Sequence, residues 1–187
     1  WLTAERTSPW AFHQFWLNAS DEDAGKYLRF FTFLDKETIE DLEQRHAAQP
    51  HERLAQKALA NEVTRMLHGQ EEVDRAEAAA AALFGGNLRS LDSQQLGDVF
   101  ADVPHSSHSR DKLAAGCSLL EFLPETSLAA SKREAREFLK NGSISINGEK
   151  LDGANALERS LGSEDLLHGQ TILLKRGKKA WHATQWT

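Results

Sequence analysis

Apolar side chains recur at three- and four-residue spacing through most of residues 1–103, a pattern that predicts amphipathic helices. Short polar side chains that can accept a hydrogen bond from a helical first turn mark three expected helix starts: Ser8, Ser20 and Asp35. Pro9 favours the first start, because a proline in the first turn sacrifices no hydrogen bond. Two further periodic segments are followed by glycines that can end a helix, Gly69 and Gly85. We therefore predict an all-helical domain in this part of the chain.

The apolar faces of these expected helices are rich in aromatic residues. Aromatic rings can stack on nucleic-acid bases, but rings at helical spacing are more typical of a core. We therefore interpret the following as core residues: Trp10, Phe12, Phe15, Trp16, Tyr27, Phe30, Phe31 and Phe33. By the same spacing, the fourth helix is expected to bury Leu54, Ala58, Leu59, Val63, Met66 and Leu67.

Residues 112–187 mix helical and strand patterns. A short helix is expected in 110–123. A second helix begins with a capping box, in which Ser131 and Glu134 each accept a hydrogen bond from the other residue's backbone N–H. This helix is expected to end at Gly142.

Two hairpins are expected after these helices. The segment 143–151 alternates apolar and polar residues around Asn147-Gly148, a pair that strongly favours a tight hairpin turn. The segment 170–186 contains two strand-like runs on either side of the sequence KRGK, which predicts a second hairpin. Helices followed by hairpins indicate a small α+β domain.

Charge also divides the chain, whose formal net charge is −6. Residues 1–110 hold 11 Lys and Arg against 18 Asp and Glu, whereas residues 111–187 hold 11 against 10. The segment 104–111 lies at this change and lacks apolar periodicity, so we expect a linker there. The predicted architecture is multi-domain: an all-α helical domain over 1–103, the linker, and an α+β domain over 112–187.

Four basic side chains share one face of the helix expected after residue 131. A helix advances about 100° per residue, so Arg136, Lys140 and Arg133 lie about 40°, 80° and 100° from Lys132. The apolar residues lie on the opposite side: Ala135, Phe138 and Leu139. We expect that side to pack on the domain and the basic side to face solvent.

This basic face has two interpretations. It is a solvated surface with local ion pairs, such as Arg133 with Glu137, or it is a surface that binds phosphates. Segregation of the cations favours phosphates, as does a second basic cluster at 175–179 in the turn of the same domain. If the two elements are adjacent, up to eight cations converge. Structured RNA fits such a surface, because it is recognised largely by shape and phosphate contacts.

Several other functions lack support in the sequence. The single cysteine, Cys117, excludes a disulfide within the chain, and no apolar stretch approaches the roughly 20 residues of a membrane span. His105 and His108 have a ligand-like spacing, but a closed zinc site needs four ligands, so we expect no metal. Neither a nucleophile elbow nor a Gly-rich phosphate loop is present. We expect no catalytic residue and no cofactor in this chain.

Several segments resemble the C-terminal half of the bacterial tyrosyl-tRNA synthetases. "SLAASKREAREFLKNGSISINGEKL" is similar to the RNA-binding module named after ribosomal protein S-four, and "LLHGQTILLKRGKKAWHATQW" resembles the last hairpin of these enzymes. "WLTAERTSPWAFHQFWLN", "KYLRFFTFL" and "LANEVTRMLHG" resemble their helical anticodon-binding domain. The resemblance spans nearly all 187 residues and is weakest at 85–110.

The resemblance implies a function for the chain within a longer enzyme. In this family a catalytic domain that uses ATP and tyrosine comes first, and its two nucleotide-binding signatures are absent here. The resemblance therefore implies a cytoplasmic tRNA-binding fragment that does not itself charge tRNA. The implied partner is tyrosine tRNA, without membrane or DNA, and the implied parent is a homodimer formed through the catalytic domain.

The resemblance also suggests which residues contact tRNA. The family's terminal module grips the long variable arm, and the matching cationic or polar positions here are Lys132, Arg133, Arg136, Lys140, Asn147, Lys150, Lys175, Arg176, Lys178 and Lys179. Asp21 matches a carboxylate that the family places near the anticodon, where it can accept a hydrogen bond from a base edge. The alternative for Asp21 is an acid that favours the positive end of a helix.

Two other functions stay open at this point. A free-standing protein could use the same module on ribosomal or other structured RNA. A protein-interaction scaffold would use neither phosphate contacts nor RNA, and its binding would survive high salt.

Overall fold

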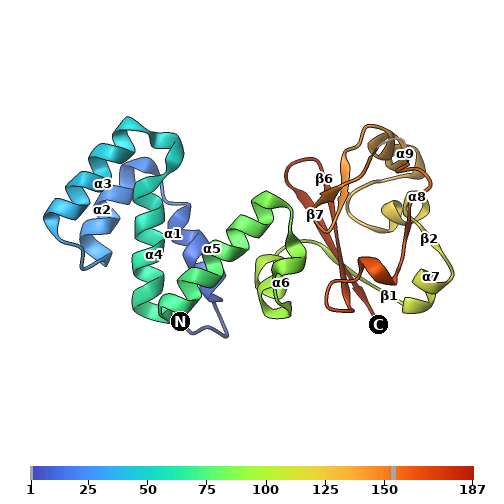
Figure 1. Ribbon diagram of the computed structural model, residues 1–187, viewed down its shortest axis with the longest axis horizontal. Coiled ribbons are helices and arrows are strands. Elements are labelled where there is room, and N and C mark those ends of the chain that lie inside the picture. Colours follow the sequence, from blue (N-terminus) through green and yellow to red (C-terminus); the bar gives the residue numbers. More distant parts are fainter. Residues whose placement is uncertain (1, 153–154) are drawn as a thin grey trace. The chain divides into compact units, whose positions relative to one another are not determined.

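The structure is a computed structural model that describes residues 2–152 and 155–187. The chain divides into two compact units, Trp1–Ala79 and Ala80–Thr187, so the boundary falls inside helix α5 (Gln70–Gly85). This boundary differs from the one expected at residue 103, because the segment after α5 packs within the second unit. Figure 1 labels the α-helices and some of the strands.

The first unit is helical, as predicted. Its elements before α5 are α1 (Pro9–Leu17), α2 (Asp21–Phe31), α3 (Lys36–Ala48), the 3-10 turn η1 (Pro50–Glu52) and α4 (Leu54–His68). The side chains of the predicted caps accept hydrogen bonds from the first turns of α1, α2 and α3: Ser8, Ser20 and Asp35. Gly69 ends α4 with a φ of 91°, a backbone conformation that favours glycine. Local chemistry therefore sets the ends of these helices.

The core of the first unit is formed by aliphatic side chains and one ring. Its buried members are Phe12, Ala24, Leu28, Ile39, Ala55, Leu59 and Val63. Several aromatic side chains predicted for this core are instead exposed: Phe15 (70%), Phe30 (78%), Phe31 (46%) and Phe33 (91%). Met66 and Leu67 are also about half exposed. The prediction was wrong for these residues because each helix buries only the part of its apolar surface that carries the core residues, and Phe33 lies outside any helix, after α2.

The second unit begins within α5 and contains two sheets. Its helical elements are η2 (Leu88–Ser90), α6 (Ser93–Val99), α7 (Arg110–Ala114), α8 (Leu119–Phe122), η3 (Leu123–Glu125), α9 (Lys132–Lys140) and η4 (Ser163–Asp165). Its strands are β1 (His105–His108), β2 (Cys117–Ser118), β3 (Ile144–Ile146), β4 (Glu149–Lys150), β5 (Ser160–Leu161), β6 (Thr171–Arg176) and β7 (Ala180–Trp186). The larger sheet has the order β1-β7-β6-β3-β4, and β2 pairs with β5 in the smaller one.

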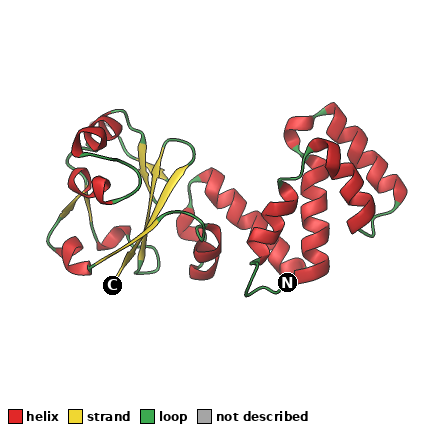
Figure 2. Ribbon diagram, turned by 180° about the vertical axis from the view of Figure 1, so that it is seen from behind, coloured by secondary structure: helices red, strands yellow, loops and turns green. Residues whose placement is uncertain are grey.

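The larger sheet is covered on both faces. One face carries Ile144, Ile172 and Leu174, which share a buried cluster with Leu139 of α9 and Phe122 of α8. The other face meets α6, so the strands run between α6 on one side and α8 and α9 on the other (Figures 1 and 2). Both predicted hairpins are confirmed, and their turns contain Asn147-Gly148 and Gly177, all with positive φ.

Two sequence predictions between residues 104 and 123 need correction. The segment 104–111 is not an irregular linker, because β1 lies within it and pairs in parallel with β7. The single helix expected in 110–123 is divided into α7, β2 and α8. Gly116, with a φ of 88°, ends the helical path after α7 and allows Cys117 to pair with Leu161.

Candidate nucleic-acid interface

Helix α9 is fixed at both ends by its own sequence. The Ser131 hydroxyl accepts from the backbone N–H of Glu134, as predicted, at 3.2 Å. The Glu134 carboxylate accepts from the backbone N–H of Ala130, at 2.8 Å, rather than from Ser131 as the capping-box prediction required. Asn141 follows the last turn and Gly142 has a φ of 59°. The helix therefore begins and ends where predicted, with one cap bond displaced by a residue.

The predicted basic face of α9 is exposed. Ala135 and Leu139 are fully buried, and the four basic side chains point away from them into solvent: Lys132, Arg133, Arg136 and Lys140. We call this set the α9 strip. The helix packs on the domain mainly through Ala135 and Leu139, so most of its basic face is free to bind a partner.

The four cations of the α9 strip differ in their partners. Lys132 pairs with Glu121 of α8, and Arg133 lies 3.8 Å from Glu137 on the exposed surface. Such exposed pairs contribute little, about 0–1 kcal/mol. Within residues 2–152 and 155–187, no ion pair or hydrogen bond of the Arg136 or Lys140 side chain is found. These two side chains are therefore the most available for a phosphate.

Part of the second basic cluster, at 175–179, makes contacts inside the fold. Lys175 and Arg176 are successive residues of β6, so their side chains leave opposite faces of the sheet. Arg176 donates to the Leu128 carbonyl at 2.6 Å and its guanidinium lies 4.8 Å from the centre of the Phe138 ring. Lys175 points to the other face, where its Nζ lies 4.6 Å from the centre of the Trp181 ring.

The expectation that up to eight cations of α9 and the 175–179 cluster converge was therefore wrong. The turn between β6 and β7 does lie next to the end of α9, because the backbone N–H of Gly177 donates to the Ser143 carbonyl. However, Arg176 contacts the helix at Phe138, about 160° around the axis from both Arg136 and Lys140. Lys178 and Lys179 are exposed at the tip of this turn. They form a basic surface separate from the α9 strip.

Asn147 was predicted to contact RNA, but its side chain is only 3% exposed. Its amide nitrogen donates to the Asp165 carbonyl at 2.6 Å, and its amide oxygen accepts from the backbone N–H of Leu173 at 2.9 Å. Its φ of 50° is one that asparagine tolerates better than most residues. Asn147 therefore shapes the β3–β4 turn and offers no polar group to RNA.

Lys150 lies on β4, the edge strand of the larger sheet, and is exposed. Lys150 and Lys140 line the same open hollow, together with Asn141, Gly142, Leu151 and Asp152. The structure thus brings one predicted cation of the hairpin next to the end of the α9 strip.

Asp21 is the first residue of α2, in the helical unit. Its side chain is 64% exposed, although two buried side chains contact it from below. The Gln56 amide nitrogen donates to Oδ1 of Asp21 at 2.5 Å, and Nε2 of His46 lies 3.2 Å from the same oxygen. This carboxylate is held in place by more than the helix terminus, and one side of it faces solvent.

One cation near the α+β surface had no signal in the sequence. Arg89 is an isolated basic residue in η2, within the region where the family resemblance is weakest. Its side chain is exposed and donates to the Glu164 carbonyl at 3.0 Å. Only the fold shows that η2 lies beside η4, in the segment that leads from β5 to β6.

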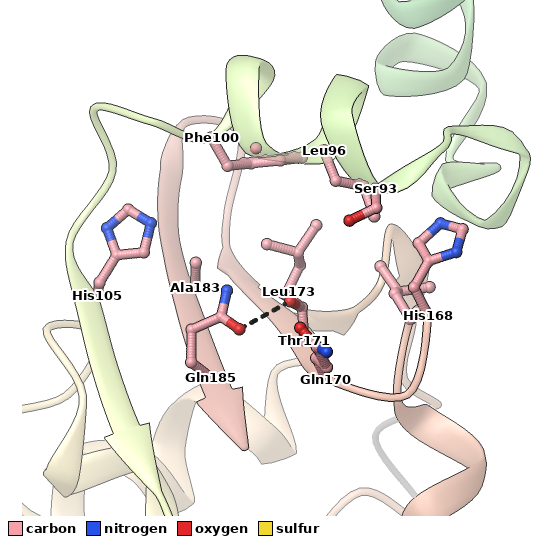
Figure 3. A pocket seen from close by; sticks show the side chains of 12 residues that line it. Ser93, Leu96, Phe100, His105, His168, Gln170, Thr171, Leu173, Ala183 and Gln185 are labelled. Carbon is pink, nitrogen blue, oxygen red and sulfur yellow. Dashed lines mark hydrogen bonds between the residues drawn. The ribbon is translucent and has the colours of Figure 1, made fainter. Parts of the chain in front are cut away.

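The enclosed cavity of the second unit is small. It lies between α6 and the face of the larger sheet that α6 covers, and Figure 3 shows Leu96 and Phe100 above Leu173 and Ala183. Its volume of about 110 Å³ is below the roughly 300–1,000 Å³ of small-molecule sites. Two of its polar groups are satisfied internally: Thr171 donates to Gln185, and His168 bonds the Leu91 carbonyl. It is therefore a poor candidate for a nucleotide or amino-acid substrate.

Two histidines of the second unit, His108 and His182, are linked by hydrogen bonds through Ser106. The backbone N–H of Ser127 donates to Nδ1 of His182, so this nitrogen carries no proton. Nε2 of His182 lies 2.8 Å from the Ser106 hydroxyl, which lies 2.7 Å from Nε2 of His108. Burial lowers the pKa of His182, and His105 and His108 lower it further. Across the described ranges, no three His, Cys, Asp or Glu side chains converge as a metal site.

None of the helices in the described part of the chain is long and apolar enough to cross a bilayer.

Comparison with known proteins covers both units. Residues 95–184 match the family model of the tyrosine–tRNA ligase SYY-like C-terminal domain, and residues 1–85 match that of the class I tRNA synthetases (W and Y). A solution structure of a tyrosyl-tRNA synthetase C-terminal domain is 30% identical, with a TM-score of 0.42. The match covers 54% of this chain and 95% of that one.

Longer relatives are also similar. C-terminally truncated mitochondrial tyrosyl-tRNA synthetases from Coccidioides posadasii and Aspergillus nidulans are each 33% identical, with TM-scores of 0.41 and 0.43. These matches cover 42% and 45% of this chain but only 21% and 23% of those chains. The chain therefore spans about a fifth of the length of these two relatives.

Proposed function

Because this chain belongs to the tyrosyl-tRNA synthetase family, we propose that it binds tyrosine tRNA and orients it for an ATP-dependent aminoacylation domain. The α+β domain binds the long variable arm through its basic surface, and the helical domain lies at the anticodon side. The free energy of binding these remote parts of the tRNA positions the end of the tRNA that reacts.

The observation that supports this proposal most is the α9 strip. Arg136 and Lys140 extend from a well-capped helix, and no carboxylate among the described residues pairs with them. Because the charged groups of Arg136 and Lys140 have no partner among the described residues, they can bind phosphates without first breaking an ion pair. The other exposed cations that we propose as tRNA contacts are Lys132, Arg133 and Lys150, and, on the separate surface of the β6–β7 turn, Lys178 and Lys179.

The proposed contact on the anticodon side is Asp21. Its outward-facing oxygen can accept a hydrogen bond from the amino or imino group of a base, while the Gln56 amide holds the other oxygen and His46 lies close to it. A carboxylate held by a buried amide selects a base better than a freely rotating one, because less freedom is lost on binding.

The chain alone is proposed to lack aminoacylation activity. Its partner domain would bind ATP and tyrosine, and we propose that the longer protein is a cytoplasmic homodimer joined through that domain. Tyrosine-dependent exchange of pyrophosphate into ATP, measured on the purified chain, should stay at background. Exchange above background would contradict this part of the proposal.

The test of RNA binding is a competition experiment. Labelled tyrosine tRNA is bound to the chain in a gel-shift assay and competed with unlabelled tyrosine tRNA, a tRNA with a short variable arm, or bulk structured RNA. We expect tyrosine tRNA to compete best and all binding to weaken as salt increases. Equal competition by the three RNAs would favour a general structured-RNA-binding protein, and binding that is independent of salt would exclude a phosphate interface.

A further inference from the structure

The α9 strip does not end at the end of its helix. Gly142 follows α9, and a side chain added at this glycine would lie 3.6 Å from Cε of Lys150. The Lys150 side chain therefore lies along the backbone that leads out of α9. It extends the basic surface from the helix to the edge strand of the sheet, where Lys140 and Lys150 line one hollow.

A second hollow begins on the other side of Lys150. It is lined by Arg89, Ile146, Asn147, Glu149, Lys150, Leu151, Arg159 and Asp165. The two hollows share Lys150 and Leu151, so they form one surface that turns around the edge strand. The formal charges lining the second hollow are three positive and two negative, which leaves a net charge of +1.

The charges of this second hollow are not equally available. The Arg159 guanidinium and the Asp165 carboxylate form an ion pair at 2.5 Å, and Asp165 is buried, so these two charges neutralise each other. Glu149 is exposed on β4, next to Lys150. The charges in this hollow that remain available to an anion are therefore those of Arg89 and Lys150. The exposed carboxylate of Glu149 opposes them.

The fold holds Arg89 in this place. The segment before η2 packs closely on the β3–β4 turn, because a side chain added at Gly86 would lie 3.1 Å from the carbonyl oxygen of Gly148. The Arg89 side chain is then anchored by its hydrogen bond to the Glu164 carbonyl. This bond uses one nitrogen of a guanidinium that has five N–H donors, so further donors are left for a ligand.

We propose that the RNA backbone follows this surface from the α9 strip, past Lys150 at the sheet edge, to Arg89, which binds a phosphate. The proposal rests on the RNA-binding function proposed above and adds to it a contact outside the helix-and-hairpin module. A flexible sugar–phosphate backbone suits a surface that bends around an edge strand, whereas a flat protein surface does not. The planar fork of arginine suits two phosphate oxygens.

The test is the salt dependence of tRNA binding by the full chain. Arg89→Gln removes the charge but keeps an N–H donor for Glu164, and Arg89→Lys keeps the charge. We expect Arg89→Gln to weaken binding by roughly tenfold and to lower the slope of log affinity against log salt by about 0.7–0.9. Arg89→Lys should keep the slope of the wild type, and so should Lys57→Gln, a matched exposed site on α4.

The outcomes separate this inference from the proposed function. If Arg89→Gln lowers the melting temperature but leaves the salt slope unchanged, Arg89 serves only to anchor η2 and the inference is wrong. If Arg89→Lys lowers the slope of log affinity against log salt as much as Arg89→Gln does, a contact between the charge of Arg89 and a phosphate is also contradicted. If the wild-type chain does not bind tyrosine tRNA at all, the proposed function itself fails, whatever Arg89 does.

Discussion

Two regions of the second unit, α9 and the β6–β7 turn, carry similar runs of basic residues but present them differently. In α9 four cations emerge on one side of a helix whose opposite side is buried. In the turn region, Lys175 and Arg176 leave opposite faces of β6. Lys175 contacts the Trp181 ring, and Arg176 contacts the Phe138 ring and the Leu128 carbonyl. Only Lys178 and Lys179 remain exposed there.

The difference comes from the period of each element. A helix returns to the same face every three to four residues, so a stretch of nine residues can gather four charges on one side. A strand alternates at every residue, so adjacent charges separate and one of them must face the core. The density of charge in a sequence therefore does not predict the density of charge on a surface until the secondary structure is known.

The largest effect is expected for Arg136→Glu combined with Lys140→Glu in α9. Each charge-assisted contact with phosphate contributes about 1.5 kcal/mol, so losing two weakens tyrosine-tRNA binding by roughly 100-fold. These positions are better targets than Lys132, where a glutamate would also face Glu121. Gel-shift titration measures the loss, and an unchanged thermal unfolding curve is the control for folding.

A change at Asn147 is expected to lower the stability of the fold without a specific effect on tRNA binding. Asn147→Ala leaves the Leu173 N–H and the Asp165 carbonyl without their partners, which should lower the free energy of unfolding by about 2 kcal/mol. Asn147→Asp keeps the acceptor for Leu173 and should be intermediate. Urea denaturation measures both variants. A variant of normal stability that has lost tRNA affinity would show that Asn147 contacts RNA after all.

A smaller effect is expected for the matched change in the turn, Lys178→Glu with Lys179→Glu. These two substitutions change the net charge by the same amount as those in the α9 variant. The residues lie at the tip of a hairpin, apart from the α9 strip. We expect a loss of tRNA affinity of about tenfold or less, because exposed, flexible charges contribute weakly. A loss equal to that of the α9 variant would remove the distinction between the two regions.

The smallest effect is a pH dependence of stability centred on His182, which ties β7 to Ser127 just before α9. The pKa of His182 is lowered from its ordinary value of 6.5, chiefly by burial. The unfolded state therefore binds a proton before the folded state does, and the free energy of unfolding should fall as the pH drops below about 6.5. Stability should be constant above that pH, apart from other titrating groups.

His182→Gln should reduce this pH dependence, measured by urea denaturation between pH 7.5 and pH 5 (about one and a half units below the reference pKa). His51→Gln, at an exposed position, is the matched control and should keep it. His108, whose pKa is also lowered by burial and by Lys112, would account for any part that persists. A wild-type chain that is equally stable at both pH values would contradict the inferred protonation of His182 and His108.

Local features of the fold were predictable from the sequence, and distant pairings were not. Helix caps such as Ser8 and the Asn147-Gly148 turn depend on a few neighbouring residues, so the sequence predicts them directly. The strand β1 depends on pairing with β7, nearly 80 residues later, and residues 105–108 therefore read as a loop. The break after α7 depends likewise on β5.

The same distinction applies to the candidate site. The exposed face of α9 followed from helical spacing alone. The internal use of Arg176 could not be predicted, because the Leu128 carbonyl and the Phe138 ring approach it only in the folded chain. Arg89 had no basic neighbours in the sequence, and its place beside the β3–β4 turn follows from the close contact between Gly86 and Gly148.

The salt dependence of tRNA binding shows whether the α9 strip binds phosphates, because each phosphate that is neutralised releases counterions. Affinity for tyrosine tRNA is measured between 50 and 200 mM salt (a range over which multi-phosphate contacts lose about 10³–10⁵ in affinity). We expect Arg136→Gln with Lys140→Gln to lower the slope of log affinity against log salt by about 1.4–1.8. A slope equal to that of the wild type would show that these side chains do not contact phosphate.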